Sequence, residues 1–99
     1  MNIRFLTAAR EELGEAFVWY ERQVPGLGFA FLDETDEAVR RIHAYPESFA
    51  EIGRGIRRAR LNRFPYGLIY SLEGDGALIV AVAHLHRRPW YWKERRPQD

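Results

Sequence analysis

Residues 77–92 read ALIVAVAHLHRRPWYW, and this stretch decides the fold. Its first six residues are all apolar, a run too short for a membrane span but suited to a strand buried inside a sheet. The turn-like sequence EGDG at residues 73–76 precedes it. The same strand then runs into four polar side chains, His84, His86, Arg87 and Arg88, before Pro89 ends any hydrogen-bonded ladder. We therefore expect a rigid strand that carries imidazole and guanidinium groups at its open end.

The sequence before this strand predicts the remaining elements. Alternating patterns at residues 56–64 and 66–72 predict two further strands, and residues 3–6 predict a short first strand. Apolar residues at spacings of three and four predict two helices, over residues 7–24 and from the Pro25-Gly26 turn to about residue 44. We interpret residues 46–55 as a connection, and Glu11, Glu12 and Glu15 as helix surface. The predicted fold class is α+β, with an antiparallel helical hairpin packed on a mostly antiparallel four-stranded sheet in the order β-α-α-β-β-β.

Composition narrows the class of protein. A chain of 99 residues predicts one domain over residues 1–99, and a hydrophobic share of 46% is incompatible with a disordered chain. The absence of cysteine excludes disulfides, thiolate nucleophiles and zinc-thiolate sites. The chain opens as a strand would, without a basic and apolar leader, so we expect a cytoplasmic protein with no membrane partner.

The two halves of the chain carry opposite charge. Residues 1–51 hold five Arg and ten acidic residues, a net charge of −5, whereas residues 52–99 hold nine Arg, one Lys and four acidic residues, a net charge of +6. The second half could therefore face a polyanion or an acidic peptide, while the first half stays solvated.

Basic and aromatic side chains gather in the second half. Cations flank the last two predicted strands, and rings lie among them; they are Arg54, Arg57, Arg58, Arg60, Arg63, Arg87, Arg88, Lys93, Arg95 and Arg96, with Tyr66, Trp90, Tyr91 and Trp92. Guanidinium groups bind phosphate oxygens and rings stack on bases, so this mixture suits single-stranded nucleic acid. It equally suits an acidic protein partner, or a solvated face whose rings cover the edge of the core. The binding residues that we predict are Arg58, Arg60, Arg63, Tyr66, Arg87, Arg88, Trp90 and Trp92.

His84 and His86 are the candidate proton carriers, because imidazole titrates near neutral pH. Their spacing of two residues could place both rings on one side of a strand, but the sequence offers no obvious third metal ligand, so we expect neither a metal nor a cofactor. A histidine that is only hydrogen-bonded in the core is the commoner case. No glycine-rich phosphate loop is present, since Gly26-Leu27-Gly28 precedes an acidic helix.

The order of these residues resembles the RelE/ParE superfamily of toxins from bacterial toxin-antitoxin pairs, over nearly the whole chain. The matching positions are Trp19-Tyr20-Glu21, Pro25-Gly26-Leu27-Gly28, Phe31, Ile42, Pro46, Phe49, Arg57-Arg58, Arg63-Phe64-Pro65-Tyr66, Tyr70, His84, Arg87, Pro89 and Trp92. The resemblance implies a small cytoplasmic toxin of the plasmid-stabilisation type. It also implies that a cognate antitoxin neutralises the toxin in a hetero-oligomer.

Two mechanisms follow from the resemblance. ParE-like members inhibit DNA gyrase, whereas RelE-like members are metal-independent ribonucleases that cut mRNA on the ribosome. A nuclease would use His84, His86, Arg87 and Tyr91 as its catalytic residues, with arginines stabilising the developing phosphate charge. The strands lack lysine, and Trp90 and Trp92 flank Tyr91 where an isolated tyrosine is expected, so the sequence favours gyrase inhibition. A binding module of the same fold without toxicity is the second alternative.

Overall fold

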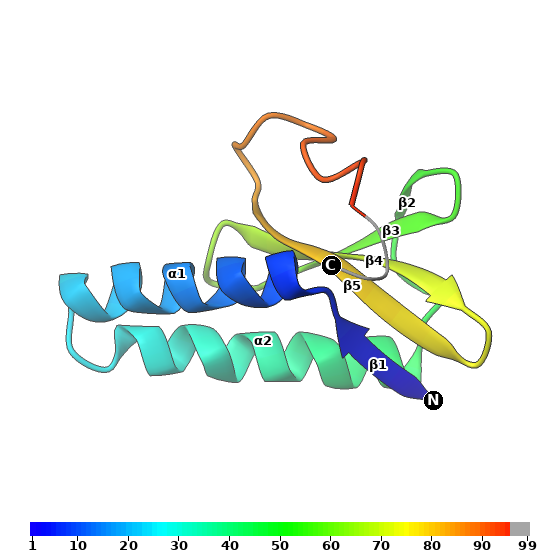
Figure 1. Ribbon diagram of the computed structural model, residues 1–99. Helices are drawn as coiled ribbons and strands as arrows, with labels where there is room; N and C mark the ends of the chain where they lie inside the picture. The colour runs from blue at the N-terminus through cyan, green and yellow to red at the C-terminus, as the bar shows by residue number, and fades with distance from the viewer. Residues whose placement is uncertain (96–99) are drawn as a thin grey trace.

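The apolar stretch after residue 76 forms β5 (Gly76–His84), an interior strand of the computed structural model, which describes residues 1–95. The elements follow in the order β1 (Asn2–Phe5), α1 (Thr7–Gln23), α2 (Leu27–Ala44), β2 (Glu51–Gly53), β3 (Ile56–Arg60), β4 (Tyr66–Glu73) and β5. Two helices pack on one face of a mixed sheet, so the predicted α+β class is confirmed (Figure 1). Arg96, which we assigned to the basic cluster, lies outside the described residues.

The sheet has five strands in the order β1-β5-β4-β3-β2, one more than the sequence predicts. The additional strand is β2, which lies within the segment that we interpreted as a connection. It has only three residues, too few to show an alternating pattern, and it pairs with β3 through a tight turn that contains Gly55 at φ +70°. β3 also ends at Arg60 rather than at residue 64, because the backbone N–H groups of Asn62 and Arg63 donate to the Glu34 carboxylate of α2 instead of to a neighbouring strand.

The helical hairpin depends on two glycines and one carboxylate. Gly26 adopts a left-handed conformation, φ +91°, and a Cβ on Gly28 would lie 2.7 Å from the carbonyl oxygen of Phe17. The Glu21 carboxylate accepts hydrogen bonds from the backbone N–H groups of Gly26 and Gly28, at 2.8 and 2.9 Å. These contacts satisfy N–H groups at the start of α2 and let the two helices approach closely.

The outer edge of β5 is only partly covered by a strand. β1 pairs with β5 in parallel from Gly76 to Ile79, and the chain then turns into α1. On the other side Ile69 pairs with Ala81 and Tyr70 with Ile79, so Val80 is an extra residue in β5, a β-bulge. The second half of β5 therefore has an edge without a strand partner among the described residues. Such an edge needs other hydrogen-bond partners.

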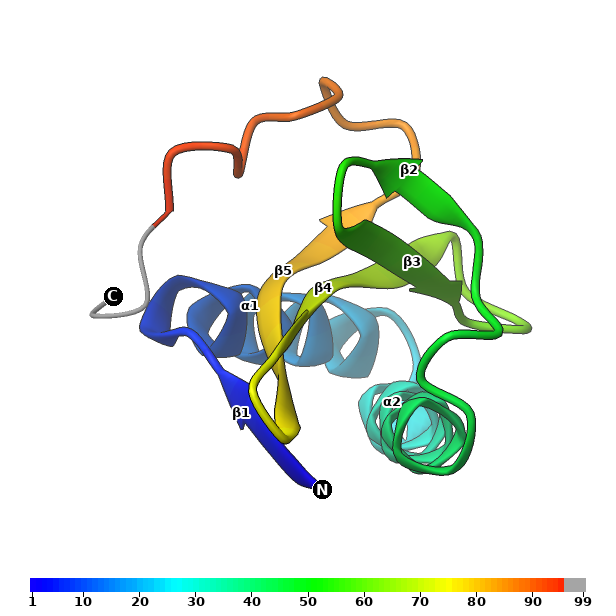
Figure 2. The same ribbon diagram turned by 90° about the vertical axis from the view of Figure 1, so that its right-hand side faces the viewer.

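After β5 the chain crosses the face of the sheet that the helices leave open. In Figure 2 residues 85–95, drawn in orange to red, arch over the sheet on the side away from the helices and descend toward the start of α1. Within this segment the side chain of Trp92 is buried, and the ring of Trp90 lies against the backbone of Gly53 in β2. Trp90 adopts φ +65°, an unusual conformation for a large residue. Among residues 1–95, neither helix combines the length and the apolar character that crossing a membrane requires.

Candidate functional site

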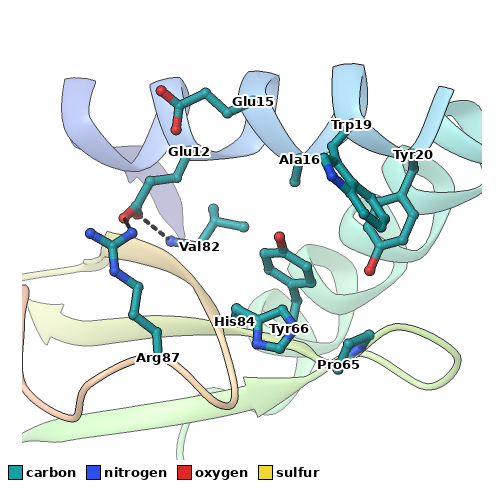
Figure 3. A pocket seen from close by; sticks show the side chains of 10 residues that line it. All are labelled: Glu12, Glu15, Ala16, Trp19, Tyr20, Pro65, Tyr66, Val82, His84 and Arg87. Carbon is teal, nitrogen blue, oxygen red and sulfur yellow. Dashed lines mark hydrogen bonds and ion pairs between the residues drawn. The ribbon is translucent and has the colours of Figure 1, made fainter. Parts of the chain in front are cut away.

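A groove of about 510 Å³ runs between α1 and the open end of β5, and we call it the α1 groove. Its floor is apolar, and Figure 3 shows rings at one end and the Glu12–Arg87 pair at the other. The residues that line it are Glu12, Glu15, Ala16, Trp19, Tyr20, Pro65, Tyr66, Val82, His84 and Arg87. Three of them, Tyr66, His84 and Arg87, are site residues predicted from the sequence.

The rings of the α1 groove form a connected set. The ring centroid of Tyr66 lies 6.1 Å from that of Tyr20 and 5.1 Å from that of His84. Burial raises the pKa values of Tyr20 and Tyr66, and the negative charge of Glu12 adds to the shift at Tyr66. Both phenols therefore stay protonated at neutral pH and can donate hydrogen bonds but cannot act as bases.

A second, smaller concavity of about 150 Å³ lies on the opposite face of the sheet, and we call it the sheet hollow. Residues 85–92 form one wall and β3 the other, where the stem of Arg58 packs over Gly67. Its lining contains five of the predicted binding residues, Arg58, Arg87, Arg88, Trp90 and Trp92. Trp92 is only 6% exposed and supports the wall, whereas Trp90 is 40% exposed and offers ring surface to a partner.

His84 and Arg87 line both concavities, because they lie where the chain leaves β5 and turns across the sheet. The Nδ1 atom of His84 accepts a hydrogen bond from the backbone N–H of His86 at 3.1 Å, and the two imidazole rings are 5.4 Å apart. His86 is exposed. Within residues 1–95 no further His, Asp or Glu joins this pair to form a group that could hold a metal ion.

The guanidinium of Arg87 contacts two side chains, and the rest of it is exposed to solvent. Its guanidinium carbon lies 3.8 Å from the centre of the Tyr91 ring, and its Nη1 atom lies 3.6 Å from Oε2 of Glu12. The side chain nevertheless keeps 55% of its surface exposed. A partner can therefore reach this cation at the boundary between the α1 groove and the sheet hollow.

The interpretation of Glu12 as helix surface is wrong, since its side chain is only 10% exposed. The carboxylate accepts hydrogen bonds from Val82 N–H at 3.0 Å, from the Tyr91 hydroxyl at 2.7 Å and from both Nη atoms of Arg95 at 2.9 Å. Burial, followed by the bond to Glu12 and its charge, raises the pKa of Tyr91 far above its ordinary value. Tyr91 thus remains a protonated donor, which removes it as a general base near neutral pH.

The other two predicted arginines lie beside the main cluster. Arg60 and Arg63 line a shallow depression with Pro65 and Leu85, next to the end of β5. Arg63 is paired with the Glu34 carboxylate of α2, which also accepts the backbone N–H groups of Asn62 and Arg63. Burial alone would raise the pKa of Glu34, but these bonds outweigh it and lower the pKa. Arg63 therefore fastens the loop to α2, whereas Arg60 remains exposed.

The family described as the ParE toxin of the type II toxin-antitoxin system parDE matches residues 3–89. Among curated proteins, no sequence matches the chain. A chain of the solved structure titled "Chromosomal ParDE TA system from P. aeruginosa" superposes with a TM-score of 0.74 at 17% sequence identity, covering 85% of this chain and 95% of that one. At this identity the structural likeness establishes a shared fold.

Proposed function

The chain belongs to the ParE toxin family of type II toxin-antitoxin systems, and from this premise we propose that it is a toxin that arrests growth by inhibiting DNA gyrase. In this proposal a cognate antitoxin binds it in the cytoplasm and keeps it inactive in a hetero-oligomer. Its functional face consists of Arg58, Arg87, Arg88 and Trp90, with His84 and Tyr66 at its border.

The observation that carries the choice of gyrase is the state of Tyr91. A ribonuclease needs a group that accepts the proton of the attacking ribose hydroxyl. The Tyr91 hydroxyl donates a hydrogen bond to Glu12, and the pKa of the phenol is raised, so Tyr91 keeps its proton and does not serve this purpose. What remains exposed is a set of cations beside an indole ring, Arg87, Arg88 and Trp90, and this chemistry anchors a protein surface.

A RelE-like, ribosome-dependent mRNA nuclease is the second candidate, because one observation favours it. The rings of His84 and His86 lie 5.4 Å apart, next to Arg87, where an imidazole could move a proton while a guanidinium stabilises phosphate charge. The same chain would then be an enzyme without a cofactor.

The test is to express the chain under an inducible promoter and to follow DNA and mRNA together. We expect double-strand breaks and loss of plasmid supercoiling, and inhibition of purified gyrase by the purified chain. The double variant Arg87→Ala/Arg88→Ala should lose most of this effect. Arg10→Ala, which removes an exposed cation from α1, should keep it and is the matched control.

Three other outcomes would contradict the proposal. Cuts within translated codons, lost in His84→Ala or Arg87→Ala, would identify a nuclease. Normal growth with intact DNA and mRNA would identify a binding module without toxicity. Inhibition of gyrase that the double variant retains in full would place the functional face elsewhere.

A further inference from the structure

The Glu12 carboxylate is the most heavily bonded acidic group in the part of the chain that the structure describes, and the proposed function does not use it. It joins α1 to β5 through Val82 N–H and to the C-terminal segment through Tyr91 and Arg95. A glutamate on a helix of this kind is normally exposed, and burying an ion requires compensating bonds of this number. The burial of Glu12 therefore indicates that the side chains bound to it depend on its position.

Arg95 already neutralises Glu12. Its guanidinium donates to both carboxylate oxygens at 2.9 Å, the fork-to-fork geometry of a strong pair, and also donates to the Val80 carbonyl at 2.8 Å. Arg87 lies farther away, 3.6 Å from Oε2 of the same carboxylate, with more than half of its side chain in solvent. Because the close pair is with Arg95, the charge of Arg87 remains available to a partner.

Tyr91 provides the surface on which Arg87 rests. The hydroxyl of Tyr91 is fixed by Glu12 at 2.7 Å, and the guanidinium of Arg87 lies 3.8 Å from the centre of its ring. A cation over a tyrosine face is attracted by the ring electrons. Glu12 thus orients Arg87 by two routes, directly through its own charge and indirectly by fixing the ring beneath.

We propose that Glu12 is a positioning residue for Arg87, which it orders before the target binds. An arginine side chain has large rotamer freedom, and ordering such a side chain on binding costs affinity. Losing this preorganisation should weaken target binding about two- to tenfold. The inference rests on the proposed function only in assuming that Arg87 contacts the target.

A purely structural role is the competing explanation, since Glu12 and Arg95 also satisfy the backbone edge of β5. The two roles differ in their dependence on Arg87. A structural glutamate would affect binding whether or not Arg87 is present, whereas a positioning glutamate has nothing to position once Arg87 is removed.

The experiment is a double-mutant cycle of Glu12→Gln and Arg87→Ala, read as the dissociation constant for purified gyrase. We expect Glu12→Gln to weaken binding two- to tenfold in the wild-type chain and to have no further effect in the Arg87→Ala chain. Glu11→Gln changes the charge equally at an exposed neighbouring position, and should leave binding unchanged. Equal losses from Glu12→Gln in both backgrounds would overturn the proposal.

A readout without gyrase separates this inference from the proposed function. In ¹⁵N relaxation measurements on the free chain, Glu12→Gln should increase the motion of the Arg87 Nε–Hε group and leave that of Arg88 unchanged. Unchanged order at Arg87 would refute the positioning role even if gyrase is the target, and increased motion would support it even if gyrase is not.

If Glu12→Gln does not fold, Glu12→Asp makes the same comparison, because the shorter side chain keeps the negative charge but draws the carboxylate away from Arg87 and from the Tyr91 hydroxyl. Arg87 should then be more mobile than in the wild-type chain. Unchanged motion of Arg87 in this variant would overturn the proposal.

Discussion

At the scale of single residues, Tyr91 links the chemistry of the site to the stability of the chain. Its hydroxyl donates to a carboxylate that is 10% exposed, and a hydrogen bond to a charged group contributes about 1.5–3 kcal/mol. We expect Tyr91→Phe to lower the free energy of unfolding by about 1–3 kcal/mol, measured by urea denaturation at neutral pH. A loss no larger than that of Tyr45→Phe, whose ring is exposed, would show that the bond is unimportant.

The same residue predicts a pH dependence. The pKa of Tyr91 is raised in the folded chain, whereas the unfolded phenol titrates near about 10. Above that pH the unfolded chain loses the proton and the folded chain keeps it, so stability falls as pH rises. The pKa values of Tyr20, Tyr66 and Tyr70 are raised as well, so Tyr91→Phe should reduce this decline without abolishing it. Urea denaturation between about pH 9 and pH 11 measures this decline in both chains. A decline that is as steep in Tyr91→Phe as in the wild-type chain would show that Tyr91 does not contribute to it.

Glu12 shows why one important residue of the site could not be predicted from the sequence. Helical spacing places it on the same face of α1 as Ala9 and Ala16, which are both buried, but its charged side chain favours an interpretation as helix surface. Its burial depends on where β1 ends and where the chain returns after Trp90, and no local pattern contains these distances. The two small residues beside it were the available signal, since they let the sheet approach that face of the helix.

At the scale of elements, the hairpin of α1 and α2 depends on close contact at Gly28. A Cβ there would lie 2.7 Å from a backbone oxygen and 2.8 Å from a ring carbon of Phe17, and backbone cannot move aside cheaply. We expect Gly28→Ala to destabilise the chain by about 1–3 kcal/mol. Gly14→Ala is the matched control, because a Cβ at that helical position meets nothing within 4 Å and alanine should stabilise α1 by about 0.5–1 kcal/mol. Thermal unfolding of both variants decides the matter, and equal stabilities would refute the packing argument.

The elements differ in how well the sequence predicts them. Both helices, β1 and β4 were predicted within a few residues, because their periodic patterns are long or their borders carry turn residues. β5 begins where predicted but ends at His84, so His86, Arg87 and Arg88 lie on the turn that follows and not on the strand. β2 was missed, and β3 was predicted four residues too long. β2 has only three residues and so shows no alternating pattern, whereas the end of β3 depends on a contact distant in sequence, that of the Glu34 carboxylate with the loop after it.

At the scale of the whole molecule, the opposite charges of the two halves predict how the chain meets its partner. The second half carries +6 against −5 in the first, and Arg87 and Arg88, which follow β5, are exposed to solvent. We expect these arginines to bind an acidic segment of the antitoxin, and we expect the association rate to fall about tenfold or more between about 0.05 and 0.5 M salt, with little change in dissociation. Stopped-flow kinetics with Arg88→Glu should show slower association at low salt. A rate that is independent of salt would mean that charge does not guide the encounter.

The sequence predicted part of the grouping of residues in the proposed functional face. The sequence placed Arg58, Arg87, Arg88 and Trp90 on one surface, and they line one hollow in the structure. It also assigned Arg63 to that surface, whereas α2 holds this side chain through Glu34. Of the residues that line the α1 groove, the sequence predicted only Tyr66, His84 and Arg87 as site residues. The wall that α1 forms was missed, because the sequence of this helix is that of an ordinary helix with one solvent-exposed face.

The early end of β1 has a consequence for any shortened form of this protein. The carbonyl of Val80 and the N–H of Val82 are closed off by a guanidinium from residue 95 and a carboxylate from residue 12. A chain truncated before Tyr91 would lose the guanidinium that covers the Val80 carbonyl, together with the three side-chain bonds that hold the Glu12 carboxylate in place, and so would expose unpaired backbone beside an apolar strand. Molecules of this kind recruit one another into intermolecular sheets, so the truncated chain should accumulate in inclusion bodies although its helices and most of its strands are intact.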